Sequence, residues 1–459
     1  MKKYKYIAGI VLGMVAVVLC SCNDLLDGKD NPYEGTTREL TVRLVYPEGH
    51  PDREGGSARV TLEDVDRGTV YTASAGNDDM ARFEVAFGIY RVSARDRVSE
   101  QDAVIYFNGA RDQMIVSAAS DLSQPVNIPL VASKTSQIVI KEVYCGGCKK
   151  DPLEGTYQSD KYVILYNNSE KVAYLDNICF GTVDPYNAYG TNVWLIADPE
   201  TGEKSFRDYV PLVECVWGFP GGGTDYPLEP GGQAVMCING AIDHTLQYPL
   251  SVDLNRADCF VCYDNTYYTN TTYHPTPGDK VRTDRYMQVL RKTGTAKAYT
   301  ISVDSPTTLF FKVPAEAGTA REYMNDAANE VLKPGYPGTR CIKVPNEWIM
   351  DGMEVFSGSS TGNAKRLAPA IDAGYVTLTE NFLGRTLYRN VDAEATLAIE
   401  GNPVVYGYAY GNDPSGIDAE ATLKAGGRVV YQDTNNSTDD FEVMDQPMIR
   451  RNGEKVPAW

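Results

Sequence analysis

A strictly alternating stretch opens the folded part of the chain, Leu40-Thr41-Val42-Arg43-Leu44-Val45-Tyr46. Apolar side chains at every second position are typical of a β-strand that buries one face. Similar short stretches follow it, and turn residues separate them. They lie at residues 58–62, 70–73, 82–87, 90–94, 103–107, 113–116 and 126–131. Seven or eight short strands in so few residues predict a small β-sandwich over residues 39–134.

A second stretch supports the same fold and reads Ala81-Arg82-Phe83-Glu84-Val85-Ala86-Phe87-Gly88-Ile89-Tyr90-Arg91-Val92. It resembles the carboxypeptidase-regulatory, transthyretin-like sandwich, in which the phrase F-x-V-x-x-G-x-Y-x-V joins two strands. Such domains usually act as spacers or supports. The resemblance therefore implies a structural role for the small sandwich.

The composition of the 459 residues favours a turn-rich β protein, because Tyr (31) outnumbers Phe (12) and both Gly (41) and Pro (25) are abundant. An apolar fraction of 43% is enough for hydrophobic cores. The net charge of −18 argues against nucleic acid as a partner, since no basic field would neutralise phosphates. The three His residues, His50, His244 and His274, stand in separate polar segments and are assigned no role.

The N-terminus predicts export and lipid anchoring. Three Lys residues in the first five positions precede an apolar stretch at 7–19, which is too short to cross a membrane and suits a signal peptide. The stretch ends in Leu19-Cys20-Ser21-Cys22, which resembles a bacterial lipobox. The resemblance implies cleavage before Cys22 and lipid attachment to its sulfur and its new amino group. Residues 1–21 would then be the signal peptide, and residues 22–38 the lipidated Cys and a flexible tether. An ordinary secretory signal with a chance Cys is the alternative.

Export changes the charge and sets the location of the mature chain. Residues 1–21 contain three Lys and no acid, so their removal changes the net charge from −18 to −21. The next residues, Asn23-Asp24-Leu25-Leu26-Asp27, look like the early acidic export signals of Bacteroidota surface lipoproteins. We therefore expect a lipid-anchored protein of the outer membrane that faces the cell exterior.

A polar break at Ser133-Lys134-Thr135-Ser136 separates a second region, residues 135–459. The stretches 138–144 and 160–169, with the later Leu228-Glu229-Pro230-Gly231-Gly232-Gln233-Ala234-Val235-Met236, resemble the lamin-tail domain, an immunoglobulin-like sandwich. Lamin-tail modules usually bind or scaffold. The resemblance thus implies a second, larger β domain without catalytic machinery.

The same region also resembles an uncharacterised family of Bacteroidota outer-membrane lipoproteins, a domain of unknown function. The phrases that carry this resemblance are Lys161-Tyr162-Val163-Ile164-Leu165-Tyr166-Asn167-Asn168-Ser169, Ile371-Asp372-Ala373-Gly374-Tyr375 and Asp433-Thr434-Asn435-Asn436-Ser437. One helix is predicted, over residues 319–332, where apolar side chains recur at helical spacing between Thr319 and Lys333-Pro334-Gly335. The predicted fold class is therefore all-β with a single helix.

Eight Cys residues follow Cys22, and an even number in an exported chain suggests disulfides. Cys145 and Cys148 flank two glycines and form the candidate disulfide. Cys259 and Cys262 make a second C-x₂-C pair, but their side chains point to opposite faces of a strand. Buried thiols, a metal site and a redox role are the alternatives.

One stretch near the C-terminus offers oxygen atoms at alternating positions, as calcium loops do: Asp433, Asn435, Ser437 and Asp439. An EF-hand would require Gly and Glu where Thr438 and Met444 stand. An Asx-rich turn is the preferred alternative. The sequence predicts no other metal site and no cofactor.

Aromatic loops are the candidates for ligand binding. Trp217, Phe219 and Tyr226 lie in a glycine-rich segment, and Tyr267 and Tyr268 lie in a polar one. Flat rings beside amide groups suit sugars or peptides, because stacking covers apolar faces while amides bond hydroxyls. Packing of the rings inside the sandwich is the alternative.

Together these features predict a lipid-anchored binding or accessory protein at the outer membrane, which works with an outer-membrane β-barrel transport receptor and is not an enzyme. Its small ligand or glycan stays unidentified. A surface adhesin or scaffold is the first alternative. The second is a glycan-directed hydrolase, which would need two carboxylates about 5 to 10 Å apart.

Overall fold

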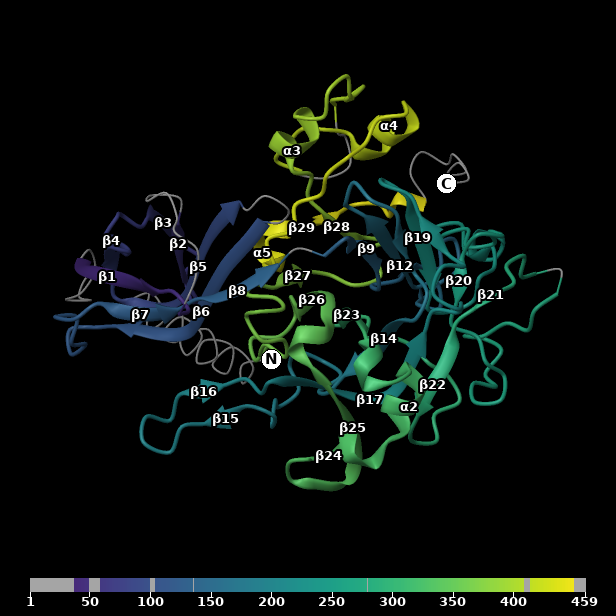
Figure 1. The fold of residues 1–459 in the computed structure, drawn as a ribbon, viewed down its shortest axis with the longest axis horizontal. Helices are drawn as coiled ribbons and strands as arrows, with labels where there is room; N and C mark the ends of the chain where they lie inside the picture. Colours follow the sequence, from purple (N-terminus) through teal and green to yellow (C-terminus); the bar gives the residue numbers. More distant parts are fainter. Residues whose placement is uncertain are drawn as a thin grey trace, which may run out of the picture.

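A computed structural model of the chain describes residues 37–48, 58–99, 104–134, 136–278, 280–407 and 413–449. Most of the regular structure in these ranges is β-strand, and small sheets near the N-terminus precede larger ones (Figure 1). The predicted all-β class, with a small sandwich followed by a larger β part, is confirmed. None of the helices in the described ranges has the length and apolar character needed to cross a membrane.

The small sandwich consists of two sheets around one hydrophobic core. The first sheet contains, in order, β4 (Met80–Ala86), β1 (Thr37–Val45) and β7 (Val126–Pro129). The second contains β3 (Val70–Ser74), β2 (Arg59–Asp64), β5 (Gly88–Ser99), β6 (Val104–Val116) and β8 (Val131–Lys134). The alternation predicted for β1 is confirmed, since Leu40, Val42 and Leu44 are buried while Arg43 and Val45 are exposed.

Two details of the small sandwich differ from the prediction. The strands expected at 103–107 and 113–116 are one continuous strand, β6. The strand expected at 126–131 divides at Leu130, whose N–H donates to the Val45 carbonyl at 2.8 Å. On one side of Leu130, β7 pairs in parallel with β1, and on the other side β8 pairs with β6. The chain thus crosses from one sheet to the other within a single residue.

The larger part contains two large sheets and three short ribbons. The seven-stranded sheet is ordered β21 (Arg285–Tyr286), β20 (Phe260–Val261), β19 (Gln233–Cys237), β12 (Tyr162–Asn167), β9 (Ile138–Tyr144), β28 (Thr386–Arg389), β29 (Phe441–Met444). The eight-stranded sheet is ordered β24 (Glu330–Lys333), β25 (Tyr336–Pro345), β17 (Tyr209–Gly218), β14 (Ile178–Val183), β23 (Thr307–Lys312), β26 (Ile349–Ser357), β27 (Val376–Leu378), and β22 (Gln288–Lys292) pairs with β17. The ribbons pair β10 (Cys148–Lys149) with β11 (Thr156–Tyr157), β13 (Ala173–Tyr174) with β18 (Pro227–Leu228), and β15 (Ile196–Ala197) with β16 (Lys204–Ser205).

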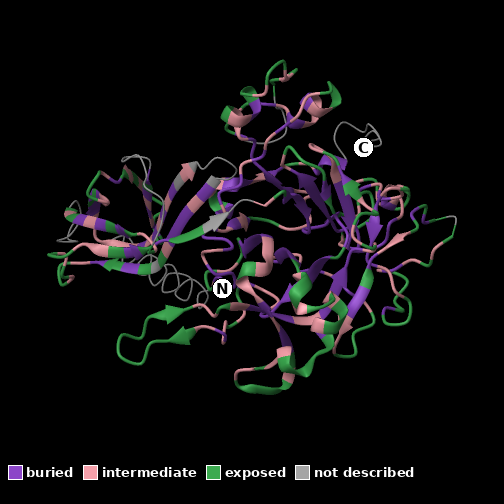
Figure 2. Ribbon diagram, in the orientation of Figure 1, coloured by how far each residue is buried: buried purple, intermediate pink, exposed green. Residues whose placement is uncertain are grey.

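The central strands of both large sheets are covered on both faces. Every residue of β9, β12 and β14 is buried, as the continuous buried colouring of this region shows (Figure 2). Phe180 and Phe310 belong to the largest core, which draws on both large sheets, whereas Tyr166 and Phe311 belong to two further cores. A strand buried on both faces has a nearly continuous apolar pattern. This explains why residues 138–144 lack the alternation seen in β1.

The predicted helix over 319–332 is correct only in its first half. Thr319 caps α2 (Ala320–Asn325) through a reciprocal pair of hydrogen bonds with Glu322. Asp326 ends the helix, because its side chain accepts the N–H of Ala328 and starts a new 3₁₀ turn. The residues after this turn form β24 instead of a last helical turn.

Further short helices escaped prediction because they contain too few residues for a periodic pattern. They are α3 (Ala393–Leu397), α4 (Ala419–Lys424), α5 (Ser437–Asp440) and the 3₁₀ turns η1 (His244–Leu246), η2 (Ala315–Ala317), η3 (Ala327–Asn329) and η4 (Asn346–Trp348).

The small sandwich packs on the larger part through polar contacts made by β5 and β6. Arg91 donates to the Tyr375 hydroxyl at 2.8 Å and lies over the Tyr375 ring, and Arg95 forms an ion pair with Asp439 at 2.7 Å. Arg111 bonds Glu203 at 3.1 Å in a more exposed position. These contacts join the second sheet of the small sandwich to residues near β27 and α5 and to the turn between β15 and β16.

Asn108 provides the buried contact of this interface and a test of it. Its side-chain amide donates to the Thr434 carbonyl at 2.5 Å, and Asn108 is buried. Asn108→Ala should lower the free energy of unfolding by about 1–3 kcal/mol, because a buried carbonyl loses its donor. The measurement is the midpoint of urea unfolding, with Arg111→Ala as the exposed control that shifts it little. Equal midpoints for the two variants would contradict a structural role for Asn108.

Candidate functional site

The lipidation site, Cys22, lies outside the described residues, as do the signal peptide and residues 22–36 of the tether. Lipid attachment at Cys22 therefore stays a prediction from the sequence.

The aromatic ligand surface predicted from the sequence is not assembled. Trp217, Phe219 and Tyr268 are core residues, and Trp217 is 0% exposed. The Trp217 and Tyr268 rings stack with centroids 5.6 Å apart. The prediction was wrong for these three residues because their rings pack in the core. For Trp217 the reason is that β17 continues to Gly218, so Trp217 lies in a strand and not in a loop.

The other two aromatic candidates, Tyr226 and Tyr267, form no shared surface with the buried rings. Tyr226 is partly buried and packs edge-on against Phe260 at 5.2 Å, with the Arg285 guanidinium over its ring. Tyr267 is 45% exposed in a turn that begins at Asp264. Of the five predicted residues, Tyr267 alone is exposed.

The candidate disulfide between Cys145 and Cys148 is absent, and the eight cysteines of the described ranges are buried and form no disulfide. Gly147 has φ +70° and turns the chain so that Cys148 enters β10. Cys145 packs in the core between the large sheets, where burial raises the pKa of its thiol to about 12. Cys148 instead points to Asp160, at 3.7 Å from Sγ to Oδ2. The turn thus directs the two thiols to different surroundings.

The oxygen atoms of the predicted calcium loop also have separate partners. Asp433 bonds Arg389, and the Ser437 hydroxyl donates to Asp372. Asp439 pairs with Arg95, and the Asn435 carbonyl accepts the N–H of Ala373. The calcium candidate, which the sequence placed behind an Asx-rich turn, is not assembled because these oxygens have separate partners. Within the described ranges, no group of three or more His, Cys, Asp or Glu side chains is arranged to hold a metal ion.

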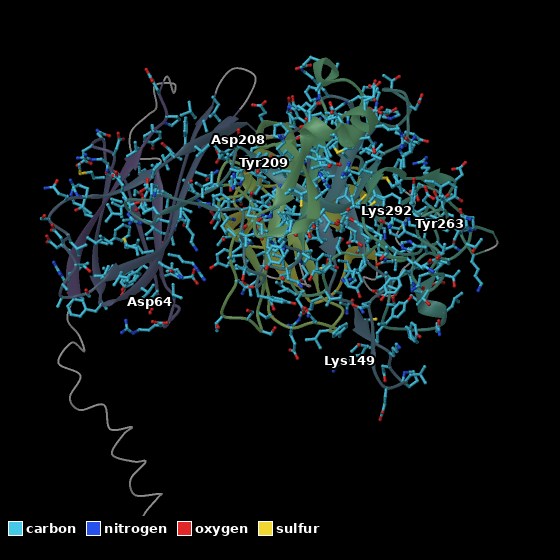
Figure 3. The ribbon with its side chains drawn as sticks, turned by 90° about the horizontal axis from the view of Figure 1, so that it is seen from below. Asp64, Lys149, Asp208, Tyr209, Tyr263 and Lys292 are labelled. Atoms are coloured by element: carbon cyan, nitrogen blue, oxygen red, sulfur yellow. The ribbon has the colours of Figure 1, made fainter. Side chains whose placement is uncertain are left out.

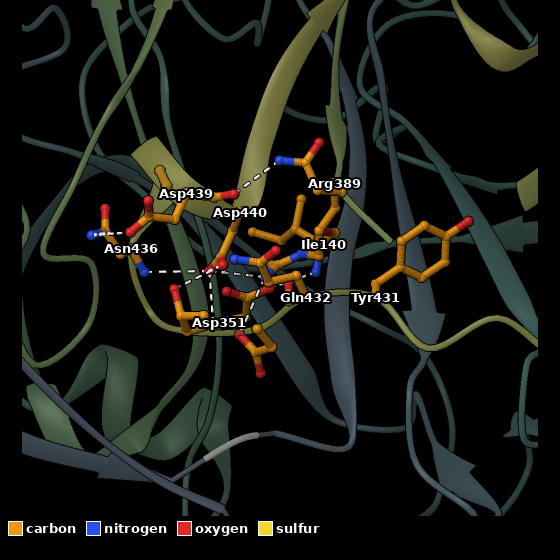
Figure 4. Close-up of polar contacts among 12 residues, drawn as sticks. Ile140, Asp351, Arg389, Tyr431, Gln432, Asn436, Asp439 and Asp440 are labelled. Atoms are coloured by element: carbon orange, nitrogen blue, oxygen red, sulfur yellow. Dashed lines mark hydrogen bonds and ion pairs between the residues drawn. The ribbon is translucent and has the colours of Figure 1, made fainter. Parts of the chain in front are cut away.

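The stretch after residue 432 instead surrounds the buried Arg389 (Figure 4). The guanidinium of Arg389 forms ion pairs with Asp351, with Asp433 at 3.2 Å and with Asp440 at 3.6 Å. Its Nε donates to the Ile140 carbonyl at 2.6 Å. Burial raises the pKa of Asp351 to about 6 and also raises the pKa of Asp433 and Asp440. One cation thus holds three buried carboxyl groups from β26 and the C-terminal segment against β9 and β28.

A second buried cation, Lys141, links β9 to α4. Its ammonium bonds Glu420 at 2.5 Å and lies within 6 Å of three Tyr ring centroids. The rings belong to Tyr166, Tyr388 and Tyr431. Cation–π contacts of this kind offset the cost of burying the charge. The arrangement stabilises the fold and leaves the ammonium enclosed.

A polar cluster that the sequence did not reveal surrounds Asp160. The carboxylate accepts from the Ser251 hydroxyl at 2.6 Å and from the Tyr144 hydroxyl at 3.2 Å, and burial raises its pKa. Nearby, His244 donates from Nε2 to the Gly240 carbonyl at 2.8 Å, so its Nδ1 accepts from the Tyr157 hydroxyl at 2.7 Å. Burial lowers the pKa of His244 and keeps it neutral. The cluster fixes the β10–β11 hairpin to the loop that contains η1.

Outside this cluster the two segments expose apolar side chains. Leu153 in the hairpin is 61% exposed, and Leu246 at the end of η1 is 86% exposed. Tyr157 and Tyr248 join the segments, with ring centroids 4.3 Å apart. We call this surface the apolar tip and define it by Pro152, Leu153, Leu246, Tyr248 and Pro249. Figure 3 shows the hairpin, marked by Lys149, projecting from the body. Single Leu residues in polar turns carry no pattern, so the sequence did not predict the tip.

His274 is another buried polar residue. Its Nε2 accepts the N–H of Tyr299 at 3.0 Å, so its Nδ1 donates to the Cys262 carbonyl at 3.1 Å. Burial lowers the pKa of His274 from 6.5 to about 4. The imidazole is therefore neutral near pH 7 and acts as a hydrogen-bonding link between two loops.

Replacing Arg389 by Met should lower the free energy of unfolding by more than about 3 kcal/mol, because three buried carboxyl groups lose their cation. The loss should be smaller at pH 5 than at pH 7.5. Arg389 lowers the pKa of each of the three carboxyl groups, so these pKa values rise further in the variant. The folded variant therefore binds protons more readily than the folded parent, and it regains stability as the pH falls. Urea unfolding at both pH values measures this, with Arg340→Met as the exposed control. A loss independent of pH would argue against the three-acid arrangement.

His274 should make stability depend on pH in the opposite sense. The unfolded chain binds a proton at His274 below pH 6.5, whereas the folded chain does so only near pH 4. Acidification from pH 7 to pH 5 should therefore cost about 2 kcal/mol through this residue. His274→Gln keeps one donor and one acceptor but does not titrate, so its stability should fall less over this interval. Identical pH profiles for the two proteins would contradict the neutral assignment.

Comparison with known proteins finds a family match over part of the chain. Residues 229–448 match the model of a family described as protein of unknown function, DUF4876. No curated protein matches the chain. The chain is similar to the crystal structure of a DUF4876 family protein from Bacteroides thetaiotaomicron, with 26% identity and a TM-score of 0.54. The similarity covers 92% of this chain and 98% of that one. The chain thus carries a DUF4876 match at residues 229–448 and resembles a DUF4876 family protein over most of its length.

Proposed function

We propose that this protein is a lipid-anchored binding or accessory protein on the outer face of the outer membrane, where it works with a β-barrel transport receptor. The observation that carries the proposal is Cys22, placed directly after a basic and apolar leader and the residues Leu19-Cys20-Ser21. The similarity to a protein from Bacteroides thetaiotaomicron supports a bacterial setting.

The connection between the anchor and the body suits this role. Fourteen residues, 23–36, separate Cys22 from the first strand, β1. A chain of this length reaches at most about 50 Å when fully extended. The body can therefore turn above the membrane but cannot leave its neighbourhood.

The interior of the body suits a rigid platform. Arg389 and Lys141, with their acidic partners, are committed to joining strands and helices. His244 and His274 are neutral and hold loops in place. Binding would then depend on exposed loops carried by this platform, which is a common arrangement for β-sandwich proteins.

A receptor in the same membrane fits an anchored partner for a physical reason. The lipid anchor confines this protein to the membrane in which the β-barrel receptor lies. Confinement raises the effective concentration of the two proteins, so a modest interface is sufficient for association. The acidic mature chain, with a net charge of −21, would favour a receptor surface of opposite charge.

Substitution of Cys22 tests the anchor. The parent protein should partition into the detergent phase and incorporate a labelled fatty acid, whereas Cys22→Ala should do neither, because it lacks the acylated sulfur. Cys20→Ala is the matched control and should behave as the parent. Crosslinking in native membranes should then recover a β-barrel protein with the parent but not with Cys22→Ala. Detergent partitioning by Cys22→Ala would contradict the anchor, and a parent that recovers no β-barrel would contradict the receptor alone.

A further inference from the structure

The apolar tip presents the most exposed large apolar side chain of the described ranges, Leu246. Leu153 is 61% exposed on the β10–β11 hairpin, which the Tyr157 and Tyr248 rings join to the loop of η1, and Pro152 and Pro249 are exposed as well. Exposed single apolar residues are ordinary, but apolar residues gathered on adjacent projecting loops mark a surface that meets something apolar.

The two loops of the apolar tip are held together by side-chain contacts. The Tyr157 and Tyr248 rings lie 4.3 Å apart, and the Lys150 ammonium lies over the Tyr248 ring at 5.4 Å. The Tyr157 hydroxyl is in turn fixed by His244, and Asp243 caps η1 by accepting the N–H of Thr245. The two loops that carry the exposed leucines are therefore held in place by contacts within the fold.

We propose that the apolar tip inserts into the lipid surface to which Cys22 anchors the chain. This inference rests on the proposed function, because it requires that anchor. Leu153 and Leu246 would enter the acyl boundary, while Tyr248 would lie at the level of the headgroups, where Tyr is enriched in membrane proteins. Lys150 can extend its ammonium toward phosphates while its stem stays in the apolar layer.

The size of the tip favours lipid over a protein partner. A stable protein interface buries more than about 1,000 Å² in total, which two loop ends with two exposed leucines cannot supply. Insertion into lipid needs only that each side chain leaves water, and burial of one Leu favours the bound state by about tenfold or more. A narrow, convex tip therefore suits an anchored body that needs a second, weak contact with its membrane.

The charges around the hairpin agree with contact to a neutral lipid surface. Lys149 and Lys150 are balanced by Asp151 and Glu154. With equal numbers of both signs the hairpin is neither attracted to nor repelled by anionic lipid, so the contact should depend little on ionic strength.

The position of the hairpin is compatible with the anchor. In Figure 3 the hairpin marked by Lys149 projects from the lower side of the large part, and β1 begins at the lower side of the small sandwich. The tether of residues 23–36 starts from that strand, and its reach of roughly 50 Å lets Cys22 and the tip meet one membrane. Two attachment points would fix the orientation of the body.

Tryptophan placed at the tip tests the inference in the full lipidated protein. The protein is reconstituted in vesicles of phosphatidylethanolamine and phosphatidylcholine that contain a brominated phosphatidylcholine. Leu246→Trp and Leu153→Trp should each add fluorescence that the brominated lipid quenches at least twofold, at both low and high salt. Tyr336→Trp, at a position 52% exposed at the start of β25, is the matched control and should not be quenched.

Each outcome decides between the proposals. Quenching at the tip no stronger than at Tyr336→Trp overturns the insertion. Blue-shifted but unquenched emission at the tip also overturns it, since a protein, either a second copy or a receptor, would then cover the leucines. Flotation of the same samples with the vesicles separates the two levels: flotation without quenching contradicts insertion alone, whereas failure to float contradicts the anchor and the inference together.

Discussion

Arg389 is the residue on which the arrangement of the whole body depends. It lies on a strand of the seven-stranded sheet, pairs with Asp351 of the eight-stranded sheet, and holds Asp433 and Asp440 of the C-terminal segment. That segment, at Thr434 and Asp439, also contacts the small sandwich. One enclosed guanidinium thereby connects two sheets and a domain interface. Its five donors and its permanent charge suit it to several partners at once.

The local hydrophobic pattern predicted those parts of the fold in which a strand or helix has one face toward water and the other toward the core. The alternation from Leu40 to Tyr46 gave the correct strand and the correct buried residues, because β1 is half-buried. The helix after Thr319 was predicted correctly at its capped start and incorrectly beyond Asp326, where a side chain redirects the backbone. Pairing with β25 then decides the conformation of the following residues, and no local pattern reports such pairing.

The candidate sites were harder to predict because their roles depend on distant partners. The oxygens after residue 432 resemble a calcium loop, but Asp433, Ser437 and Asp439 each bond a partner far away in sequence. Trp217 stands next to glycines that suggest a loop, yet Gly218 is a strand residue packed against Leu290, where a β-carbon would lie 2.9 Å from a side-chain methyl. Spacing likewise gave no information on whether the Cys145 and Cys148 side chains share one environment. The anchor, in contrast, is a linear motif, so its prediction from the sequence needs no tertiary contact.

The parallel pairing of β1 with β7 has a mechanical consequence for an anchored protein. A membrane tether would pull on the start of β1, whereas the larger part is connected through the end of β7, by way of Leu130 and β8. In parallel strands these two points lie at opposite ends of the shared ladder, from Val42 opposite Val126 to Val45 opposite Pro129. Tension would therefore load all the hydrogen bonds of the ladder together, in shear, and would not open them one by one. In a lipid-anchored chain the small sandwich would therefore transmit force between the membrane and the body through this ladder.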